Sequence, residues 1–153
     1  MASASLHRAA LAAALLLAAG VAQADNCTID LDSDDAMKFD KTALTVSASC
    51  PEITINLRHT GRLPATAMGH NVVIAASDVW QGVAQDGVKA GPANHYVPQD
   101  DARVVGYTQI IGGGEQISAT FPGSRLTAGT AYMFFCSFPG HWAIMKGELT
   151  VTP

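Results

Sequence analysis

Short stretches in which apolar and polar residues alternate are the feature that most constrains the fold of this chain. Ile53–Arg58 alternates cleanly over six residues, and Cys27–Asp32 does so over another six. A period of two is typical of strands that bury one face. Similar short runs, separated by glycine or proline turns, occur at 43–46, 72–74, 103–111, 116–121, 131–136 and 147–152. The pattern predicts an all-β sandwich or barrel of about eight strands.

One segment departs from this alternation. Between Ala75 and Gly91, the apolar residues Val79, Trp80 and Val83 are spaced as on a helix rather than on a strand. We therefore expect one short helix inserted between strands. The segment 94–101 that follows, with Pro98, is expected to be an exposed loop.

The N-terminus has the pattern of an export signal. A short basic region at His7 and Arg8 is followed by the uncharged run Ala9–Val21 and then by Ala22-Gln23-Ala24, a small-x-small cleavage pattern. The apolar run is shorter than the roughly 20 residues that a membrane-spanning helix needs. We expect a secretory signal peptide at 1–24, cleavage after Ala24, and a single exported domain at 25–153. Export places that domain in an oxidising compartment, where disulfides persist.

The charge of the expected mature chain excludes some functions. Residues 25–153 carry 8 basic and 13 acidic side chains, a net charge of −5 with neutral histidines. Such an acidic chain is not held on nucleic acid by its overall charge. No later segment is apolar for long enough to cross a bilayer, so we expect no membrane insertion.

Three cysteines, an odd number, leave one thiol without a partner. Cys27 and Cys50 lie near the start of the domain among strand-like residues, with no histidine nearby, so we predict that they form a disulfide. Two buried free thiols are the alternative. Cys136 is then a lone thiol in an oxidising compartment, which calls either for deep burial or for a bound metal.

The residues that follow Cys136 favour a metal. Cys136, His141 and Met145 form a Cys-x4-His-x3-Met run that contains the turn Pro139-Gly140. Thiolate, imidazole and thioether are soft or borderline donors, which suit copper rather than magnesium or calcium. A mononuclear copper site of this kind needs one more imidazole. The remaining candidates in the mature chain are His70, which follows a glycine and precedes an apolar strand, and also His59 and His95.

Together these motifs resemble the azurins, the bacterial periplasmic blue-copper proteins of the cupredoxin family. The resemblance rests on Met68-Gly69-His70-Asn71, on Tyr132-Met133-Phe134-Phe135-Cys136, on Phe138-Pro139-Gly140-His141 and on Met145-Lys146-Gly147, and it covers essentially the whole mature chain. It implies a Greek-key cupredoxin-like fold. Cys27 and Cys50 stand where azurins have their disulfide. The resemblance also implies a periplasmic location.

The same resemblance implies roles for individual residues. Cys136, His70 and His141 would be the three strong ligands of a type 1 (blue) copper centre, with Met145 and the Gly69 carbonyl as weak axial ligands. The backbone N–H groups of Asn71 and Phe138 would donate to the Cys136 sulfur, and the Asn71 side chain would join the two ligand loops. His59, which precedes Thr60, is expected to be a hydrogen-bonded structural residue.

The implied function is the transfer of single electrons, with copper cycling between Cu(II) and Cu(I) and the electron passing through His141. The expected partners are periplasmic redox proteins such as c-type cytochromes or a terminal reductase, met through an apolar patch around His141 formed by Met37, Leu63, Met68 and Phe138. We expect a monomer. A copper-binding or copper-sequestering module without a dedicated redox partner is the alternative, because it would use the same ligands.

An enzyme with Cys136 as nucleophile and His141 or His70 as base is a weaker hypothesis. It has suitable residue types, but no third group that would orient the base is evident, and it leaves Met145 unexplained. The sequence therefore predicts a protein that is not an enzyme.

Overall fold

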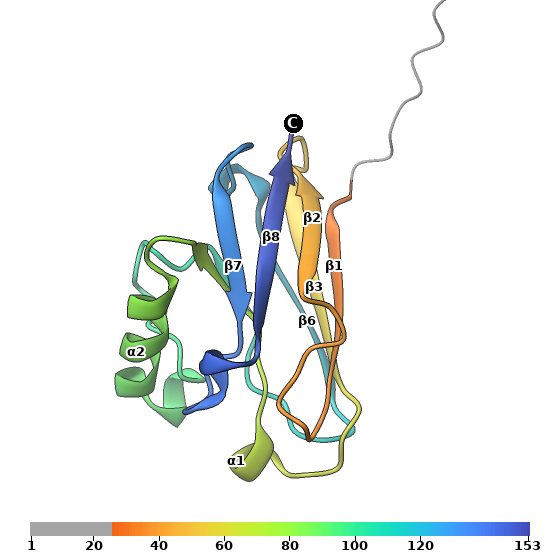
Figure 1. Cartoon of the computed structure of the whole chain (residues 1–153), viewed down its shortest axis with the longest axis vertical. Coiled ribbons are helices and arrows are strands. Elements are labelled where there is room, and N and C mark those ends of the chain that lie inside the picture. The colour runs from red at the N-terminus through yellow and green to blue at the C-terminus, as the bar shows by residue number, and fades with distance from the viewer. Residues whose placement is uncertain (1–25) are drawn as a thin grey trace, which may run out of the picture.

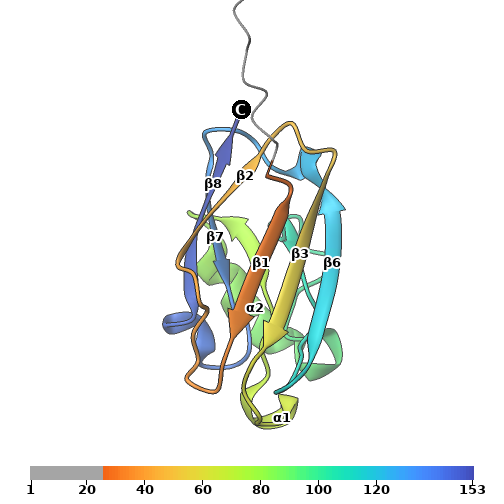
Figure 2. The same ribbon diagram turned by 90° about the vertical axis from the view of Figure 1, so that its right-hand side faces the viewer.

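Two β-sheets face each other across the core of the protein (Figures 1 and 2). The computed structural model describes residues 26–153, so the expected leader at 1–24 and its cleavage site lie outside the described residues. The first sheet has the order β1-β3-β6, with β1 at Thr28–Ser33, β3 at Glu52–His59 and β6 at Gln116–Pro122. The second has the order β2-β8-β7-β4-β5, with strands at Ala43–Ser47, Lys146–Thr152, Ala131–Phe135, Val73–Ala76 and Gly106–Tyr107.

Each sheet contains both parallel and antiparallel pairs of neighbouring strands. β1 pairs in parallel with β3, and β2 pairs in parallel with β8, whereas the other paired strands of residues 26–153 are antiparallel. The predicted all-β sandwich of about eight strands is thus confirmed.

The alternation in the sequence is what builds the core between the sheets. Ile53, Ile55 and Leu57 of β3 are at most 1% exposed, and the residues between them are more exposed. They pack with residues of the opposite sheet, among them Val46, Phe134 and Leu149. Because successive side chains of a strand point to opposite faces, the first sheet buries one face against the second sheet and leaves its other face more polar.

The helix α2, at Trp80–Ala90, covers the outer face of the second sheet (Figure 1). Its buried residues Trp80, Val83 and Ala84 pack in a second apolar cluster with Val73, Ala75 and Phe135. β4 is therefore buried on both faces, because Ile74 points into the main core. The predicted inserted helix is confirmed, but it begins at Trp80 rather than at Ala75, since residues 75 and 76 belong to β4.

Other helical segments are short. The structure contains α1 at Ala65–Met68 and three 3-10 turns, η1 at Pro92–Asn94, η2 at Gly123–Arg125 and η3 at His141–Ala143. The predicted strand at 103–111 is largely wrong, because only Gly106–Tyr107 forms a strand there. Arg103 is instead bound through its side chain to Asp86 and Asp101, which holds the first part of this segment as a loop.

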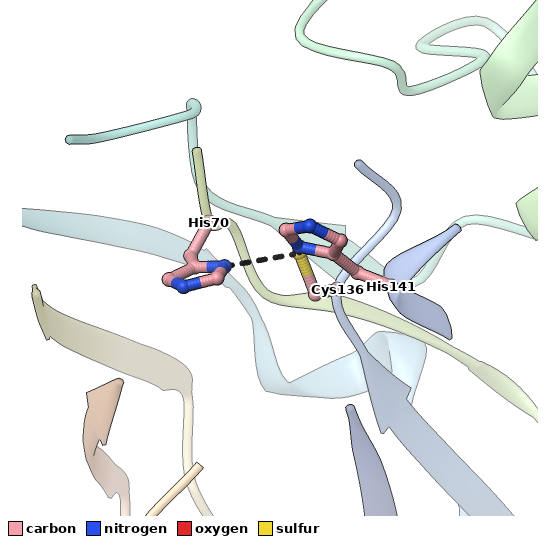
Figure 3. A group of neighbouring side chains, drawn as sticks. All are labelled: His70, Cys136 and His141. Carbon is pink, nitrogen blue, oxygen red and sulfur yellow. Dashed lines mark hydrogen bonds between the residues drawn. The ribbon is translucent and has the colours of Figure 1, made fainter. Parts of the chain in front are cut away.

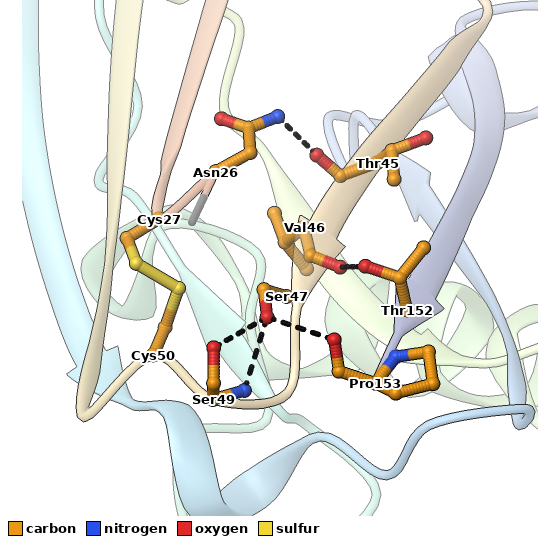
Figure 4. Close-up of a disulfide and its surroundings, with 9 residues drawn as sticks. All are labelled: Asn26, Cys27, Thr45, Val46, Ser47, Ser49, Cys50, Thr152 and Pro153. Carbon is orange, nitrogen blue, oxygen red and sulfur yellow. Dashed lines mark hydrogen bonds between the residues drawn. A yellow bond between two sulfur atoms is a disulfide. The ribbon is translucent and has the colours of Figure 1, made fainter. Parts of the chain in front are cut away.

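The predicted disulfide between Cys27 and Cys50 is present, with its two Cα atoms 5.6 Å apart (Figure 4). It joins the residue before β1 to the turn between β2 and β3. Beside it, the Ser47 hydroxyl contacts the hydroxyl of Ser49 and donates to the carbonyl of Pro153. Among residues 26–153, no helix is long and apolar enough to cross a membrane.

Candidate metal centre

The ten-residue loop between β7 and β8 brings three potential donors close together. Cys136 follows the last residue of β7, and Met145 precedes the first residue of β8. The N–H of Cys136 donates to the Met145 carbonyl at 3.0 Å, and the N–H of Met145 donates to the His141 carbonyl at 2.8 Å. Gly140 has a positive φ of 85°, a conformation that favours glycine, and it begins the turn η3 that carries His141.

His70 reaches the same place from a different part of the chain. Its backbone exchanges two hydrogen bonds with Ile111, of 3.0 and 2.9 Å, just before β4. The preceding Gly69 has no room for a side chain, because a Cβ atom there would lie 2.4 Å from the Ala65 carbonyl oxygen. A glycine at this position therefore lets the backbone just before His70 pack closely against Ala65 of α1 and against Ile110.

The orientation of the His70 ring follows from its hydrogen bond. Nε2 lies 2.8 Å from the carbonyl oxygen of Asp34. Because a carbonyl can only accept, Nε2 must carry the proton, and the lone pair is left on Nδ1. This carbonyl is 36 residues away in sequence, and no signal in the sequence pointed to it.

Figure 3 shows the three side chains that these two segments bring together. The Cys136 sulfur lies 3.8 Å from Nδ1 of His70 and 3.7 Å from Nδ1 of His141. All three donor atoms lie within 4.8 Å of one another. Cys136 and His70 are fully buried, whereas His141 is 4% exposed.

These separations fit a single bound ion. In a trigonal plane, with bonds of about 2.3 Å to sulfur and about 2.0 Å to nitrogen as found for zinc, sulfur and nitrogen are about 3.7 Å apart. One thiolate and two imidazoles in such a group are typical of blue-copper centres. The residues His70, Cys136 and His141 are thus compatible with one type 1 copper ion.

Burial keeps the donors uncharged in the metal-free protein. It raises the pKa of the Cys136 thiol to about 12, against the opposing effect of the Asn71 and Phe138 backbone N–H groups on the sulfur. It lowers the pKa of His70 to about 4, and it also lowers the pKa of His141. Both imidazoles are therefore neutral near pH 7 and can donate lone pairs, and binding of a cation must release the thiol proton.

The two ligand-bearing segments are joined by Asn71. Its side-chain oxygen accepts the N–H of Ser137 at 2.9 Å, and its Nδ2 donates to the Ser137 hydroxyl at 2.8 Å. Asn71 was expected to have this role, whereas Ser137 was missed although it directly follows Cys136. Within residues 26–153, every buried side-chain nitrogen and oxygen has a hydrogen-bond partner.

Gly69 and Met145, the two residues expected to supply axial ligands, have backbone atoms beside Cys136. The Gly69 carbonyl oxygen is 3.9 Å from the Cys136 sulfur. Met145 is fully buried, and its backbone is bonded to Cys136 and to His141. Ligation by Gly69 and by Met145 stays a prediction.

The other two histidine candidates do not join the donor group. His59 is buried, its Nδ1 accepts the N–H of Gly61 at 3.0 Å, and its Nε2 lies 2.9 Å from the Met68 carbonyl. Its ring stacks on that of His70 with centroids 4.4 Å apart, so it is a hydrogen-bonded neighbour of the site, as expected. The Nδ1 of His95 is bonded to the backbone of Ile110 instead.

Of the residues expected to form an apolar patch, Phe138 contacts His141 with ring centroids 4.6 Å apart. Leu63 is 42% exposed, and Met37, Met68 and Phe138 are partly exposed. Ile144, which is 63% exposed and belongs to the ligand loop, was not among the expected patch residues.

Comparisons with known proteins agree with this geometry. The sequence model of a family described as copper binding proteins, plastocyanin/azurin family, matches residues 25–152. The chain is 51% identical to Azurin-1 of Alcaligenes xylosoxydans xylosoxydans over 123 residues, which cover 80% of this chain and 95% of the relative. It is 44% identical to the azurin of Pseudomonas aeruginosa over 146 residues, or 95% and 99% of the two chains.

A solved structure is similar as well. The azurin Az-iso2 from the obligate methylotroph Methylomonas sp. strain J superimposes with a TM-score of 0.79 at 42% sequence identity. The match covers 84% of this chain and 99% of that azurin. The similarity in fold thus includes nearly the whole of the other protein.

Proposed function

The chain belongs to the plastocyanin/azurin family of copper-binding proteins, and from this premise we propose that it carries single electrons between redox proteins of the periplasm. The observation that carries the proposal is the buried group of one thiol and two neutral imidazoles, of which His141 alone has any exposed area. No enzymatic activity is part of the proposal.

Cys136, His70 and His141 would hold the copper, with Met145 and the Gly69 carbonyl as weaker axial ligands. When bound, copper supplies a one-electron couple whose potential depends on the axial ligand and on hydrogen bonds to the cysteine sulfur. The backbone N–H groups of Asn71 and Phe138, which act to lower the pKa of the Cys136 thiol, would donate to that sulfur. Such bonds stabilise the more electron-rich reduced state.

The chain's own hydrogen bonds hold the donors before any ion binds. The His70 ring is fixed by the Asp34 carbonyl, and the Cys136 backbone by the Met145 carbonyl. Asn71 ties the segment of His70 to that of Cys136 through Ser137. A site fixed in this way changes little between oxidation states, which favours fast electron transfer.

Of the three donor residues, only His141 has any exposed area. Phe138 packs against that ring, and Leu63 and Ile144 add exposed apolar surface at or near the ligand loops. We infer that Met37, Leu63, Met68 and Phe138 form the patch on which a redox partner such as a c-type cytochrome or a terminal reductase docks, with Ile144 as a further contributor. A small apolar patch suits the brief contacts of an electron carrier.

The location is part of the same proposal. Residues 1–24 would direct export and be removed after Ala24, which leaves the domain 25–153 in the periplasm. The disulfide between Cys27 and Cys50 fits an oxidising compartment.

The first test is the visible and EPR spectrum of the copper-loaded protein. An intense blue colour with the EPR signature of type 1 copper is expected, and it should be absent in Cys136→Ala, which lacks the thiolate. A colourless copper complex of the wild-type protein would contradict the proposal.

The second test measures electron exchange with a c-type cytochrome by stopped flow. Leu63 and Val88 are both 42% exposed, but Val88 lies on α2. Leu63→Glu is expected to slow the reaction at least tenfold, because it places a charge in the docking patch, whereas the matched control Val88→Glu should change the rate less than twofold. A blue protein that exchanges no electrons with any redox protein would favour a copper-sequestering module instead.

A further inference from the structure

His95 has an unusual backbone conformation beside the metal centre. It follows the turn η1 with φ 54° and ψ 28°, and the next residue, Tyr96, has φ 55°. Left-handed backbone is unfavourable for residues other than glycine, and it persists where the surrounding structure holds it. Two consecutive residues in this conformation therefore indicate that the surrounding structure holds this segment in place.

The ring of His95 is bonded to the segment that pairs with His70. Its Nδ1 accepts the backbone N–H of Ile110 at 3.3 Å. The next residue, Ile111, exchanges both of its backbone hydrogen bonds with His70. The side chain of Ile110 also lies against Gly69, since a Cβ atom on that glycine would be 2.6 Å from the Ile110 Cγ2 atom.

The backbone of His95 is bonded to Asn71, the residue that follows His70 and joins its segment to that of Cys136. Its carbonyl accepts a hydrogen bond of 3.0 Å from Nδ2 of Asn71. The oxygen of the same Asn71 side chain accepts the N–H of Ser137, the residue after Cys136. One residue thus contacts, through its ring and its carbonyl, the supports of both His70 and Cys136.

Local bonds keep His95 in this position. The N–H of His95 donates to the Pro92 carbonyl, that of Tyr96 donates to the Gly91 carbonyl, and Val97 is fully buried. The Tyr96 ring packs edge-on against Phe138 at 5.3 Å between centroids. The segment 94–101, expected to be merely an exposed loop, is therefore anchored against the metal centre at His95 and Tyr96.

We propose that His95 is a positioning residue for the copper centre, because its ring and its carbonyl form a clamp on two supports of the site. The ring holds Ile110, next to the backbone partner of His70, and the carbonyl holds the Asn71 side chain that joins the His70 segment to Ser137. The proposal deepens the proposed function and rests on it for its metal readout. By holding Asn71 in place, the clamp would keep the N–H groups aimed at the Cys136 sulfur. Loosening the clamp would weaken those hydrogen bonds and so disfavour the reduced state.

Two variants separate the ring's hydrogen bond from the backbone conformation. His95→Gly removes the acceptor but tolerates the left-handed conformation, so the fold is retained. His95→Asn also tolerates it, and its Oδ1 occupies the place of Nδ1 and can accept from Ile110. Asn94→Ala is the matched control, since it removes the bond of 3.0 Å from Asn94 to the Ala90 carbonyl in the same segment.

The first readout is hydrogen exchange of the Ile110 amide in the metal-free protein. Exchange should be at least tenfold faster in His95→Gly than in the wild type, and it should return toward the wild-type rate in His95→Asn. An unchanged rate in His95→Gly would overturn the clamp. This measurement does not involve copper, so it distinguishes a failure of the clamp from a failure of the proposed function.

The second readout is the reduction potential of the copper-loaded protein. His95→Gly should weaken the preference for Cu(I) over Cu(II) about tenfold, which for a one-electron couple lowers the potential by about 59 mV. His95→Asn should restore most of this shift, and Asn94→Ala should leave the potential unchanged. A potential in His95→Gly that equals or exceeds the wild-type value would reject the positioning role, even if the variant is less stable.

Discussion

The two ends of strand β8 use cysteine in opposite ways. At its end, near Thr152, Cys27 and Cys50 are joined covalently beside Ser47, Ser49 and Pro153 (Figure 4). Before its start, at Lys146, Cys136 is a buried thiol that faces two imidazoles at 3.7 and 3.8 Å. Both ends connect segments that are distant in sequence, but only the disulfide end does so through a covalent bond between its own side chains.

The difference lies in what each cysteine faces rather than in burial. Cys50 is 3% exposed and Cys136 is fully buried, so burial alone does not distinguish these two cysteines, although Cys27 is partly exposed. The disulfide end needs no ligand and has no titrating group in its crosslink. The metal end is held by hydrogen bonds around neutral donors, so its contribution to stability depends on copper and on pH. The following changes test this contrast, from the largest expected effect to the smallest.

Copper should stabilise the protein only through the metal end. At a free copper concentration of about 1,000 times the dissociation constant, the free energy of unfolding should rise by about 4 kcal/mol. The rise should be lost in Cys136→Ser and retained when Cys27 and Cys50 are both replaced by serine. Thermal or urea unfolding with and without copper measures it, and equal stabilisation of Cys136→Ser would argue against these ligands.

Removal of the disulfide should have the reverse pattern. The double replacement of Cys27 and Cys50 by serine should lower the free energy of unfolding by about 3 kcal/mol, because the unfolded chain is no longer closed over a sequence separation of 23 residues. The visible spectrum of the copper form should be unchanged. A shifted spectrum in this variant would show that the two ends are coupled.

Acid should weaken the metal-free protein through His70. Its pKa is 6.5 when unperturbed and about 4 in the folded state, because burial disfavours the charged ring. The unfolded state therefore binds more protons as the pH falls below 6.5, and the free energy of unfolding should drop by about 2 kcal/mol between about pH 7 and about pH 5. Urea unfolding across this range measures the drop.

His70→Gln is the control for that experiment, and it should reduce the dependence without abolishing it, because burial also lowers the pKa of His141. Bound copper should also flatten it until the ion is released, because a coordinated imidazole cannot take up a proton. A metal-free wild-type protein whose stability is constant between about pH 7 and about pH 5 would contradict the expected role of His70.

The smallest expected effect is at the disulfide end. Ser47→Ala removes the hydroxyl that contacts Ser49 and the Pro153 carbonyl, and it should lower the free energy of unfolding by about 1 kcal/mol. Ser124→Ala, at an exposed serine of η2, should stay within about 0.5 kcal/mol of the wild type. Neither change should shift the visible spectrum of the copper form. A spectral shift in Ser47→Ala would show that the metal centre depends on contacts at the far end of β8.

Much of the fold and of the donor set could be predicted from the sequence because it is encoded locally. Alternation in stretches such as 53–58 directly gives the buried face of a strand, and the helical spacing of Trp80 and Val83 gives the face of α2. The prediction of a strand at 103–111 was largely wrong, because apolar residues of this segment are buried although most of the segment is not paired with a neighbouring strand. The ion pair of Arg103 with Asp86, which lies 17 residues away, is a contact that no local pattern encodes.

The sequence by itself determined that Cys136, His141 and Met145 share one short loop, because a spacing of four and three residues around a Pro-Gly turn keeps them near one another. It also placed Cys27 and Cys50 apart from any histidine. Residue patterns alone left His59, His70 and His95 open as the second imidazole, and both the glycine before His70 and the family resemblance favoured His70.

Only the tertiary structure decided among these histidines. His59 stacks on His70, yet both of its ring nitrogens are engaged by the backbone, and His95 uses Nδ1 to hold Ile110. His70 alone of the three has a bond to Asp34 that leaves its Nδ1 lone pair toward Cys136, 66 residues away in sequence. The tautomer of a buried ring is set by whichever backbone group packs against it, and that contact exists only when the two sheets have come together.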